Sequence, residues 1–310
     1  MSAIVTLTLS PCIDKTTSVP RLIAEKKLKC SDPKLEPGGG GINVARAIKK
    51  LGGEAIAVYP AGGYTGKFFT DLLQREQVTA KVVEVSSMLR ENVIVLDESA
   101  NQQYRFGMPG AALQTQEWQQ CLKVVEEVPD VTFIVASGSL PPGVPSDIFA
   151  HLAEIAHKKN AKLIVDTSGE PLKQAAQKKV YLLKPNLAEL SMLAGKEELN
   201  MESVEEVARQ VIETGSCEVM VVSLGAAGAL LVTEKETYEV VPPAVVRKST
   251  VGAGDSMVAG IVWSLSQNKN LQQALQYGVA CGTAATMNAG TELCRLADVE
   301  KLYNIIRKKS

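Results

Sequence analysis

Short apolar runs rich in valine and isoleucine recur along the chain, and amphipathic stretches separate them. The clearest runs are residues 4–9, 55–59, 131–136, 161–166, 180–183 and 219–223. Continuous apolar runs of this length are typical of strands buried on both faces. Because strands that alternate with helices form sheets covered on both sides, the pattern predicts an α/β fold with a mostly parallel sheet flanked by helices.

The stretches between these runs show helical spacing. Apolar residues recur at intervals of three and four at positions 148, 152 and 155, and again at 204, 207 and 211. In the second stretch, Ser203 and Glu206 have the spacing of a capping box, and Gly215 is a stop signal. The last third of the chain is predicted to be helical over residues 254–267, 270–289 and 296–308.

Two polar regions interrupt this rhythm, residues 12–36 and 87–107. The second reads as two strands around a turn at residues 97–101. We expect both regions to form a small β-sheet lid outside the main sheet, since a flap of this kind can cover an α/β active site. No linker or repeat divides the chain, so residues 1–310 are predicted to form one domain that carries this lid.

Charge and cysteine content exclude several classes of function. The chain has 33 basic and 34 acidic residues, which argues against a nucleic-acid partner. Its six cysteines are scattered and it has two histidines, so a zinc site is not expected. No apolar run reaches the ~18 residues that span a membrane, and the N-terminus reads as a strand rather than a leader. We expect a cytoplasmic protein with no membrane partner.

A run of four glycines, Gly38 to Gly41, leads through Asn43 into an amphipathic helix. Glycines allow a close approach to a ligand, and a helix N-terminus offers free N–H groups. A flexible turn is the plainer alternative. A dinucleotide site fits less well, because no acidic residue follows at the spacing that such a site needs.

Residues 61–68 resemble a phosphate-binding P-loop at first sight. However, Ala61 replaces the first glycine, and Phe68 stands where a magnesium-binding hydroxyl is required. We therefore interpret Gly62 and Gly63 as a turn between a strand and a helix.

A third motif places an acidic residue at the start of a helix. Gly252, Ala253 and Gly254 precede Asp255, so their N–H groups could form an anion hole for a phosphoryl group. The Asp255 carboxylate could then act as the catalytic base that accepts a proton from the attacking hydroxyl. The alternative is that Asp255 only favours the positive end of the helix.

Further motifs follow predicted strands. Lys184 precedes Asn186 and Glu189, which are three residues apart and could hold Mg²⁺ through water, or could simply begin a helix. Two more glycine-bearing loops lie after strands, at residues 137–143 and 223–228. Ligands of open α/β sheets bind beyond the carboxyl ends of the strands, so we group these motifs in one site.

Together, the glycine run with Asn43, the stretch around Asp255 and the Asn186/Glu189 motif resemble the PfkB family of ribokinase-like sugar kinases. The resemblance covers the whole chain and implies a ribokinase-like fold. The implied reaction is transfer of the ATP γ-phosphoryl group to O1 of fructose 6-phosphate. Members that act as 1-phosphofructokinase or tagatose-6-phosphate kinase share these motifs and are alternatives. A non-catalytic sugar-phosphate-binding regulator is a remote one.

The resemblance also implies roles for individual residues. The sugar would be held by Asp14, Gly38, Gly39, Asn43 and Ser139, and its existing phosphate by Lys27, Arg90 and Arg105. ATP would be contacted by Lys184, Asn186, Ser223, Gly225, Gly228 and Asn288. A potassium ion could lie near Ser249, Val251, Ala285, Asn288 and Gly290. The resemblance further implies a homodimer joined through the β lid. Two residues depart from the pattern that the resemblance implies. Cys12 stands where Ser or Ala is expected, and Glu292 stands where Arg is expected.

Overall fold

The computed structural model describes residues 3–308. Met1, Ser2, Lys309 and Ser310, which the single-domain prediction includes, lie outside the described residues. Among residues 3–308, no helix is long and apolar enough to cross a membrane.

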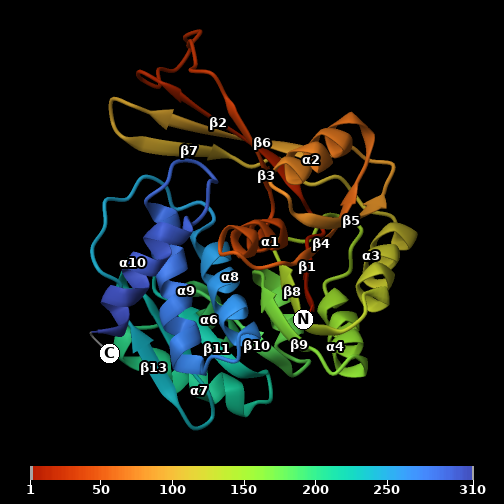
Figure 1. Ribbon diagram of the computed structural model, residues 1–310, viewed down its shortest axis with the longest axis vertical. Helices are drawn as coiled ribbons and strands as arrows, with labels where there is room; N and C mark the ends of the chain where they lie inside the picture. The colour runs from red at the N-terminus through yellow and green to blue at the C-terminus, as the bar shows by residue number, and fades with distance from the viewer. Residues whose placement is uncertain (1–2, 309–310) are drawn as a thin grey trace.

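The larger sheet has nine strands within the described part of the chain, in the order β13-β12-β11-β10-β9-β8-β1-β4-β5 (Figure 1). Every pairing from β11 to β5 is parallel, and β12 and β13 add an antiparallel hairpin at one edge. The strands are β1 Ala3–Leu7, β4 Ile56–Ala61, β5 Thr79–Glu84, β8 Val131–Ser137, β9 Lys162–Asp166, β10 Val180–Leu183, β11 Cys217–Ser223, β12 Ala229–Val232 and β13 Thr237–Val240. The predicted, mostly parallel sheet is confirmed.

Helices cover both faces of this sheet, because alternate strand residues point to opposite sides. Val221 of β11 belongs to one apolar core and its neighbour Val222 to the other. The first core is closed by α1 Gly40–Lys50, α2 Gly63–Arg75, α8 Ala253–Ser266, α9 Leu271–Thr286 and α10 Leu296–Arg307. The second is closed by α3 Thr115–Glu127, α4 Ile148–Lys158, α5 Gly169–Ala175, α6 Leu187–Leu193 and α7 Val204–Glu213.

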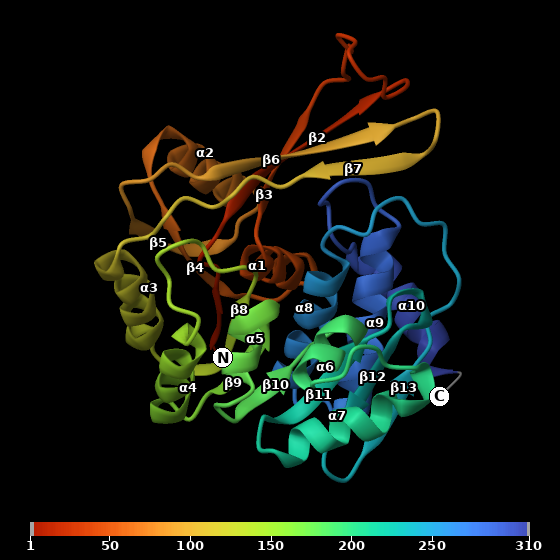
Figure 2. The ribbon, with the colours of Figure 1, turned by 180° about the vertical axis from the view of Figure 1, so that it is seen from behind.

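The two polar regions form a second sheet of four strands in the order β3-β2-β6-β7. Its strands are β2 Cys12–Val19, β3 Lys34–Gly38, β6 Arg90–Asp97 and β7 Gln102–Phe106. β2 pairs with β6 in parallel, and the outer pairings are antiparallel. Figures 1 and 2 show this sheet lying across one end of the molecule. The expected β-sheet lid is therefore present as a separate sheet.

One predicted cap is wrong. Ser203 precedes α7, but its backbone is already helical and its side chain makes no capping bond to the helix. Instead, Asn200 accepts a hydrogen bond from the Ser203 N–H at 2.9 Å and starts a single 3₁₀ turn, Met201–Ser203, ahead of α7. Asn200 therefore takes the role that the sequence pattern gave to Ser203.

Candidate active site

The carboxyl ends of the central parallel strands meet at one edge of the larger sheet. Ser137 ends β8, Asp166 ends β9 and Lys184 follows β10. The Gly138 N–H donates to the Asp166 carbonyl at 3.0 Å, which ties the ends of β8 and β9 together. The Ser223 N–H donates to the carbonyl of residue 185 at 2.9 Å and joins the next two strand ends. The strand-end motifs predicted from the sequence thus form one continuous edge.

Asp255 lies at this edge, in the first turn of α8. Gly252 caps the helix with φ 72, a left-handed conformation that favours glycine. The Asn43 side chain, from α1, donates its Nδ2–H to Asp255 Oδ2 at 2.9 Å. Two motifs that are 212 residues apart in sequence therefore meet through one hydrogen bond.

The surroundings of Asp255 favour its protonated form. Burial, followed by the negative charge of Asp166, raises the pKa of Asp255 to about 6. The hydrogen bond from Asn43 and the positive charge of Lys184 lower this pKa, and Asp14 raises it. A carboxylate with a pKa close to neutrality suits a general base, because it is ionised at neutral pH and still accepts a proton readily.

A buried lysine stands next to the loop that precedes Asp255. Lys184 Nζ lies 3.1 Å from Asp166 Oδ1, and the two side chains are 8% and 16% exposed. Burial lowers the pKa of Lys184, but the charge and hydrogen bond of Asp166, together with the charges of Asp255 and Glu189, raise this pKa above its usual value. The Lys184 ammonium also lies 3.5 Å from the point where a Cβ on Gly254 would stand. This cation and the N–H groups of the first helical turn can hold an anion, since the one recorded bond of Ala253 N–H, to the Thr250 carbonyl, is long at 3.5 Å.

Close packing accounts for the glycine run. A side chain at Gly38 would collide with the Asp14 carboxylate, and one at Gly40 would collide with Ser137. Gly39 has φ 113, which again favours glycine. The run brings the end of β3, in the second sheet, against the strand ends of the larger sheet, so it is more than a flexible turn.

One face of the second sheet carries several predicted substrate residues. Cys12 and Asp14 of β2 pair with Arg90 and Asn92 of β6, so the four side chains share a face. Asn92 donates to Asp14 Oδ1 at 2.9 Å, and the Cys12 thiol donates to the same oxygen at 3.3 Å. Burial raises the pKa of Asp14, and these two hydrogen bonds lower it. The Asp14 carboxylate is therefore held in one orientation.

The two predicted phosphate-binding arginines lie on this same sheet. Arg105 is on β7, opposite Ile94, and its Nη2 donates to Thr250 Oγ1 at 2.6 Å, just before the Gly252–Gly254 loop. Arg90 donates from its two terminal nitrogens to the carbonyls of Ser10 and Met108, each at 3.0 Å. The lid is thus in contact with the loop that carries the proposed anion hole.

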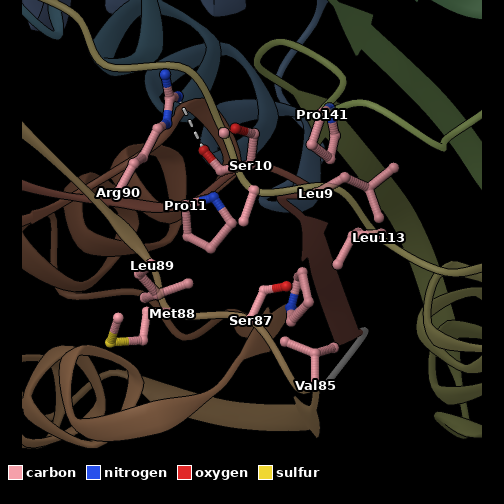
Figure 3. Close-up of a pocket in the computed structure, with 13 residues that line it drawn as sticks. Leu9, Ser10, Pro11, Val85, Ser87, Met88, Leu89, Arg90, Leu113 and Pro141 are labelled. Atoms are coloured by element: carbon pink, nitrogen blue, oxygen red, sulfur yellow. Dashed lines mark hydrogen bonds between the residues drawn. The ribbon is translucent and has the colours of Figure 1, made fainter.

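Figure 3 shows Arg90 and Ser10 beside a small cavity of about 20 Å³. Apolar side chains such as Leu9, Leu89 and Leu113 form much of its wall. This volume holds about one water molecule. The cavity is therefore too small to hold a sugar phosphate.

Two predicted residues are less closely tied to this group. Ser139 is exposed in the segment that follows β8. Lys27 is exposed in the loop of residues 20–33 between β2 and β3. Figures 1 and 2 show this loop projecting from the free end of the second sheet. Within one chain, the structure does not bring Lys27 to Asp255.

Structural roles explain part of the predicted nucleotide contacts. Asn186 caps α6: its Oδ1 accepts from the Glu189 N–H at 2.9 Å, and Glu189 Oε2 accepts from the Asn186 N–H at 2.8 Å. This pair therefore begins a helix, as the alternative interpretation predicted. The capping bonds use Asn186 Oδ1 and Glu189 Oε2 and leave Asn186 Nδ2 and Glu189 Oε1 outside the capping box. Gly228 has φ 101, and a Cβ there would collide with the Val240 carbonyl, so the turn itself requires glycine.

The five residues of the predicted potassium site come from two neighbouring segments. The N–H groups of Lys248 and Ser249 both donate to the Thr286 carbonyl, at 2.8 and 3.2 Å. This joins the segment of Ser249 and Val251 to the segment of Ala285, Asn288 and Gly290. The Asn288 amide donates to the Leu293 carbonyl at 2.8 Å, which fixes the second segment.

Sequence reasoning gave no site role to Asp166 or Asn92. Asp166 lies next to Lys184 and raises the pKa of Asp255, while Asn92 orients Asp14. Asp166 carried a usable signal, since a buried strand that ends in an acidic residue places it at the ligand-binding edge. Asn92 carried none, because its partner is reached only through the pairing of β2 with β6.

Comparison with known proteins agrees with this geometry. A family model described as pfkB family carbohydrate kinase matches residues 5–298. The chain is 45% identical over 304 residues to ATP-dependent 6-phosphofructokinase isozyme 2 of Escherichia coli K12, covering 98% of both chains. It is 40% identical over 303 residues to the protein of that name from Mycobacterium tuberculosis H37Rv, covering 97% of this chain and 89% of the relative.

Solved structures of phosphofructokinase-2 from E. coli have the same fold. A complex with substrates and products superposes with a TM-score of 0.94 at 44% identity, covering 98% of this chain and 99% of the other. A complex with potassium gives a TM-score of 0.95 at 44% identity, covering 99% and 100%. A tetrameric inhibited form gives 0.93 at the same identity and coverage.

Proposed function

The chain belongs to the pfkB family of carbohydrate kinases, and we propose that it is an ATP-dependent 6-phosphofructokinase that converts fructose 6-phosphate to fructose 1,6-bisphosphate. The observation that carries the proposal is the Asp255 carboxylate. It lies in the first turn of α8, where the charge of Lys184 acts on it, and it accepts a hydrogen bond from Asn43. Identity to two 6-phosphofructokinases over nearly the whole chain supports the choice of sugar.

In this reaction Asp255 takes the proton from the O1 hydroxyl of the sugar. The O1 oxygen forms a bond to the γ-phosphorus of ATP, the bond from that phosphorus to the bridging oxygen breaks, and ADP leaves. Because the pKa of Asp255 is raised to about 6, the carboxylate is ionised at neutral pH and can act as the base.

The negative charge of the transferring group needs fixed positive partners. The N–H groups in the first turn of α8, over Gly252, Ala253 and Gly254, supply an anion hole. The Lys184 ammonium, held by Asp166, lies beside the same turn. A preorganised cation with helix N–H groups stabilises a phosphoryl group without reorganisation during the reaction.

The lid face is proposed to hold the sugar phosphate. Arginine grips phosphate through two parallel hydrogen bonds, and Arg90 and Arg105 lie on the strands that also carry Asp14 and Asn92. The residues proposed to hold the sugar are Asp14, Gly38, Gly39, Asn43 and Ser139, with Arg90 and Arg105 on its phosphate. Lys27 stays a prediction from the sequence.

The proposed ATP contacts lie along the strand ends, at Lys184, Asn186, Ser223, Gly225, Gly228 and Asn288. No group of three acidic, cysteine or histidine side chains among residues 3–308 is arranged to bind a metal directly, so a divalent cation would keep several waters. Negative charge is nevertheless concentrated here, because Asp166, Asp255 and Glu189 all act on the charge of Lys184. Burial and the charge of Asp166 raise the pKa of Glu189. Asn186 and Glu189 would hold Mg²⁺ through water, and the ion would shield phosphate charge when bound.

A monovalent cation would lie between the two segments described above, which the hydrogen bonds to the Thr286 carbonyl hold together. Backbone and side-chain oxygens of Ser249, Val251, Ala285, Asn288 and Gly290 would hold potassium there. The potassium complex of the E. coli relative supports this assignment. We further propose that residues 1–310 act as one kinase domain whose second sheet is the lid.

We also propose a homodimer joined through the lid. Arg105 faces the larger sheet, so its neighbours Tyr104 and Phe106 on β7 point to the outer face, where they are 38% and 48% exposed. Ile23, in the loop between β2 and β3, is 45% exposed. Exposed apolar side chains on the lid favour a protein contact, and the E. coli relative has a tetrameric form.

A coupled assay that follows ADP release tests the function. Fructose 6-phosphate, fructose 1-phosphate and tagatose 6-phosphate are each offered with ATP and Mg²⁺. We expect the highest kcat/KM for fructose 6-phosphate. A far higher kcat/KM for either other sugar would assign the chain to another branch of the family, and no turnover with any of them would contradict the assignment as a kinase.

A further inference from the structure

Arg46 is the largest of the fully buried side chains in residues 3–308, at 1% exposure. It lies on α1, one helical turn after Asn43. A buried guanidinium is costly unless its N–H groups are paired, so its position is set by its partners. The function proposed above gives this residue no role.

The partners of Arg46 come from several parts of the fold. Its Nε and Nη2 donate to the two carboxylate oxygens of Glu76, just after α2, at 2.9 and 2.6 Å. Its Nη1 donates to the Pro37 carbonyl of β3 at 2.7 Å and to the Thr291 carbonyl at 3.3 Å. The Glu36 carboxylate lies 3.5 Å from its Nη2. The guanidinium is thus clamped between α2, β3 and the loop before α10.

One further bond points toward the reacting centre. Arg46 Nη1 also donates to Asn43 Oδ1 at 3.3 Å, and the same Asn43 side chain donates from Nδ2 to Asp255 Oδ2 at 2.9 Å. A side-chain amide has an acceptor end and a donor end. The fixed N–H of Arg46 occupies the acceptor end, so the donor end faces Asp255.

We propose that Arg46 is a positioning residue, which locks the Asn43 amide so that it can only donate to Asp255. The inference rests on the proposed function, since it takes Asp255 as the base. Without the guanidinium, the Asn43 amide could turn and accept a hydrogen bond from a protonated Asp255. The turned amide would stabilise the acid form, whereas the locked amide stabilises only the carboxylate.

Other charged groups around Asp255 are not changed by this lock. Lys184 faces it from the end of β10, Asp166 from the end of β9 and Asp14 from β2. The Asn43 amide, on α1, also contacts Asp255 but carries no charge. A variant of Arg46 therefore reports on the amide while the three charges stay in place.

The test compares Arg46→Lys with a matched control, Arg209→Lys. Arg209, on α7, is also held by several bonds, including 2.6 Å to the Thr233 carbonyl and 2.8 Å to Glu205, but it lies outside the site. For Arg46→Lys we expect the acid limb of kcat/KM against pH, with fructose 6-phosphate, to move up by about one pH unit. Activity then falls roughly fivefold at pH 6 and hardly at all at pH 8. The control leaves the limb in place.

A double-mutant cycle with Asn43→Ala separates positioning from general damage. If Arg46 acts through Asn43, Arg46→Lys shifts the acid limb of the pH profile in the protein that keeps Asn43. It adds no shift in the protein that already carries Asn43→Ala. An unshifted limb in folded Arg46→Lys, or an equal further shift in the Asn43→Ala background, overturns the inference.

Neutron diffraction of the unaltered protein at pH 5 decides the matter even if Arg46→Lys does not fold. The expected result is deuterons of Asn43 Nδ2 facing Asp255, and an Asn43 Oδ1 that faces Asp255 overturns the inference. The proposed function fails in a different way: Asp255→Asn then keeps nearly full activity. An inactive Asp255→Asn with an unshifted Arg46→Lys rejects only the role of Arg46.

Discussion

Replacing Asp255 by Asn should stabilise the folded protein at neutral pH. The local structure raises the pKa of Asp255 from 3.8 to about 6, chiefly through burial and then through the charge of Asp166. The folded state therefore resists ionisation of this carboxyl more than the unfolded state does. Asparagine keeps the shape and can still accept the Asn43 hydrogen bond, but it carries no charge.

The sign follows from the protons bound in each state. Below pH 3.8 the carboxyl is protonated whether the chain is folded or not, so the charge costs nothing. Between 3.8 and 6 the folded state binds more protons, and its stability falls as the pH rises. Above pH 6 the full cost is present, and a shift of about two units corresponds to at most about 3 kcal/mol.

Thermal unfolding of the wild type and Asp255→Asn at pH 4.5 and pH 8 measures this cost. For a chain of this size, about 3 kcal/mol corresponds to roughly 4 °C in Tm, so the variant should melt a few degrees higher at pH 8. At pH 4.5 the difference should be much smaller. Asp71→Asn, at an exposed site on α2, is the control and should change Tm little at either pH. Equal or lower stability of Asp255→Asn at pH 8 would show that burying the Asp255 charge does not destabilise the folded protein.

Three further variants test other parts of the site and assembly. Arg105→Gln should raise KM for fructose 6-phosphate by roughly 10- to 100-fold and leave KM for ATP within a few-fold, since a hydrogen bond to a charged group is lost; steady-state kinetics with an unchanged sugar KM would remove Arg105 from the phosphate site. Lys184→Met removes the cation that lowers the pKa of Asp255, so the acid limb of the rate profile should move to higher pH. The kcat at pH 7 should fall about tenfold or more, because a partner of the transferring phosphoryl group is lost. An acid limb that stays in place contradicts this role of Lys184. Phe106→Asp should give monomers by light scattering at micromolar concentration while Met201→Asp, at a remote exposed residue, leaves dimers; a wild type that is itself monomeric would count against the lid interface.

Local patterns predicted the fold well because each apolar run is long enough to fix a buried strand. The runs at residues 131–136, 161–166 and 219–223 correspond to β8, β9 and β11. The last three helices also begin and end within a few residues of their predicted bounds. The edge strand β5 was missed because its side chains are largely exposed and half of them are polar, so no apolar run marks it.

Single-residue roles were harder to predict, because they depend on contacts between distant segments. The acidic residue of the third motif could be recognised at a helix start, but its raised pKa depends on burial in the folded chain and on Asp166, 89 positions away in sequence. The cap at Ser203 failed because Asn200, three residues earlier, accepts the Ser203 N–H and starts a 3₁₀ turn, so the backbone of Ser203 is already helical. The buried clamp of Arg46 could not be predicted, since Glu76 and Thr291 reach it only in the folded chain.

Everything proposed for the reaction depends on Asp255 as the base for phosphoryl transfer to the sugar. The most direct test of this role is the rate of fructose 1,6-bisphosphate formation by Asp255→Asn at pH 8, with calorimetry to show that fructose 6-phosphate and ATP still bind. We expect kcat to fall roughly 10²-fold or more while binding is retained within a few-fold. Nearly full activity in a folded Asp255→Asn protein would contradict it.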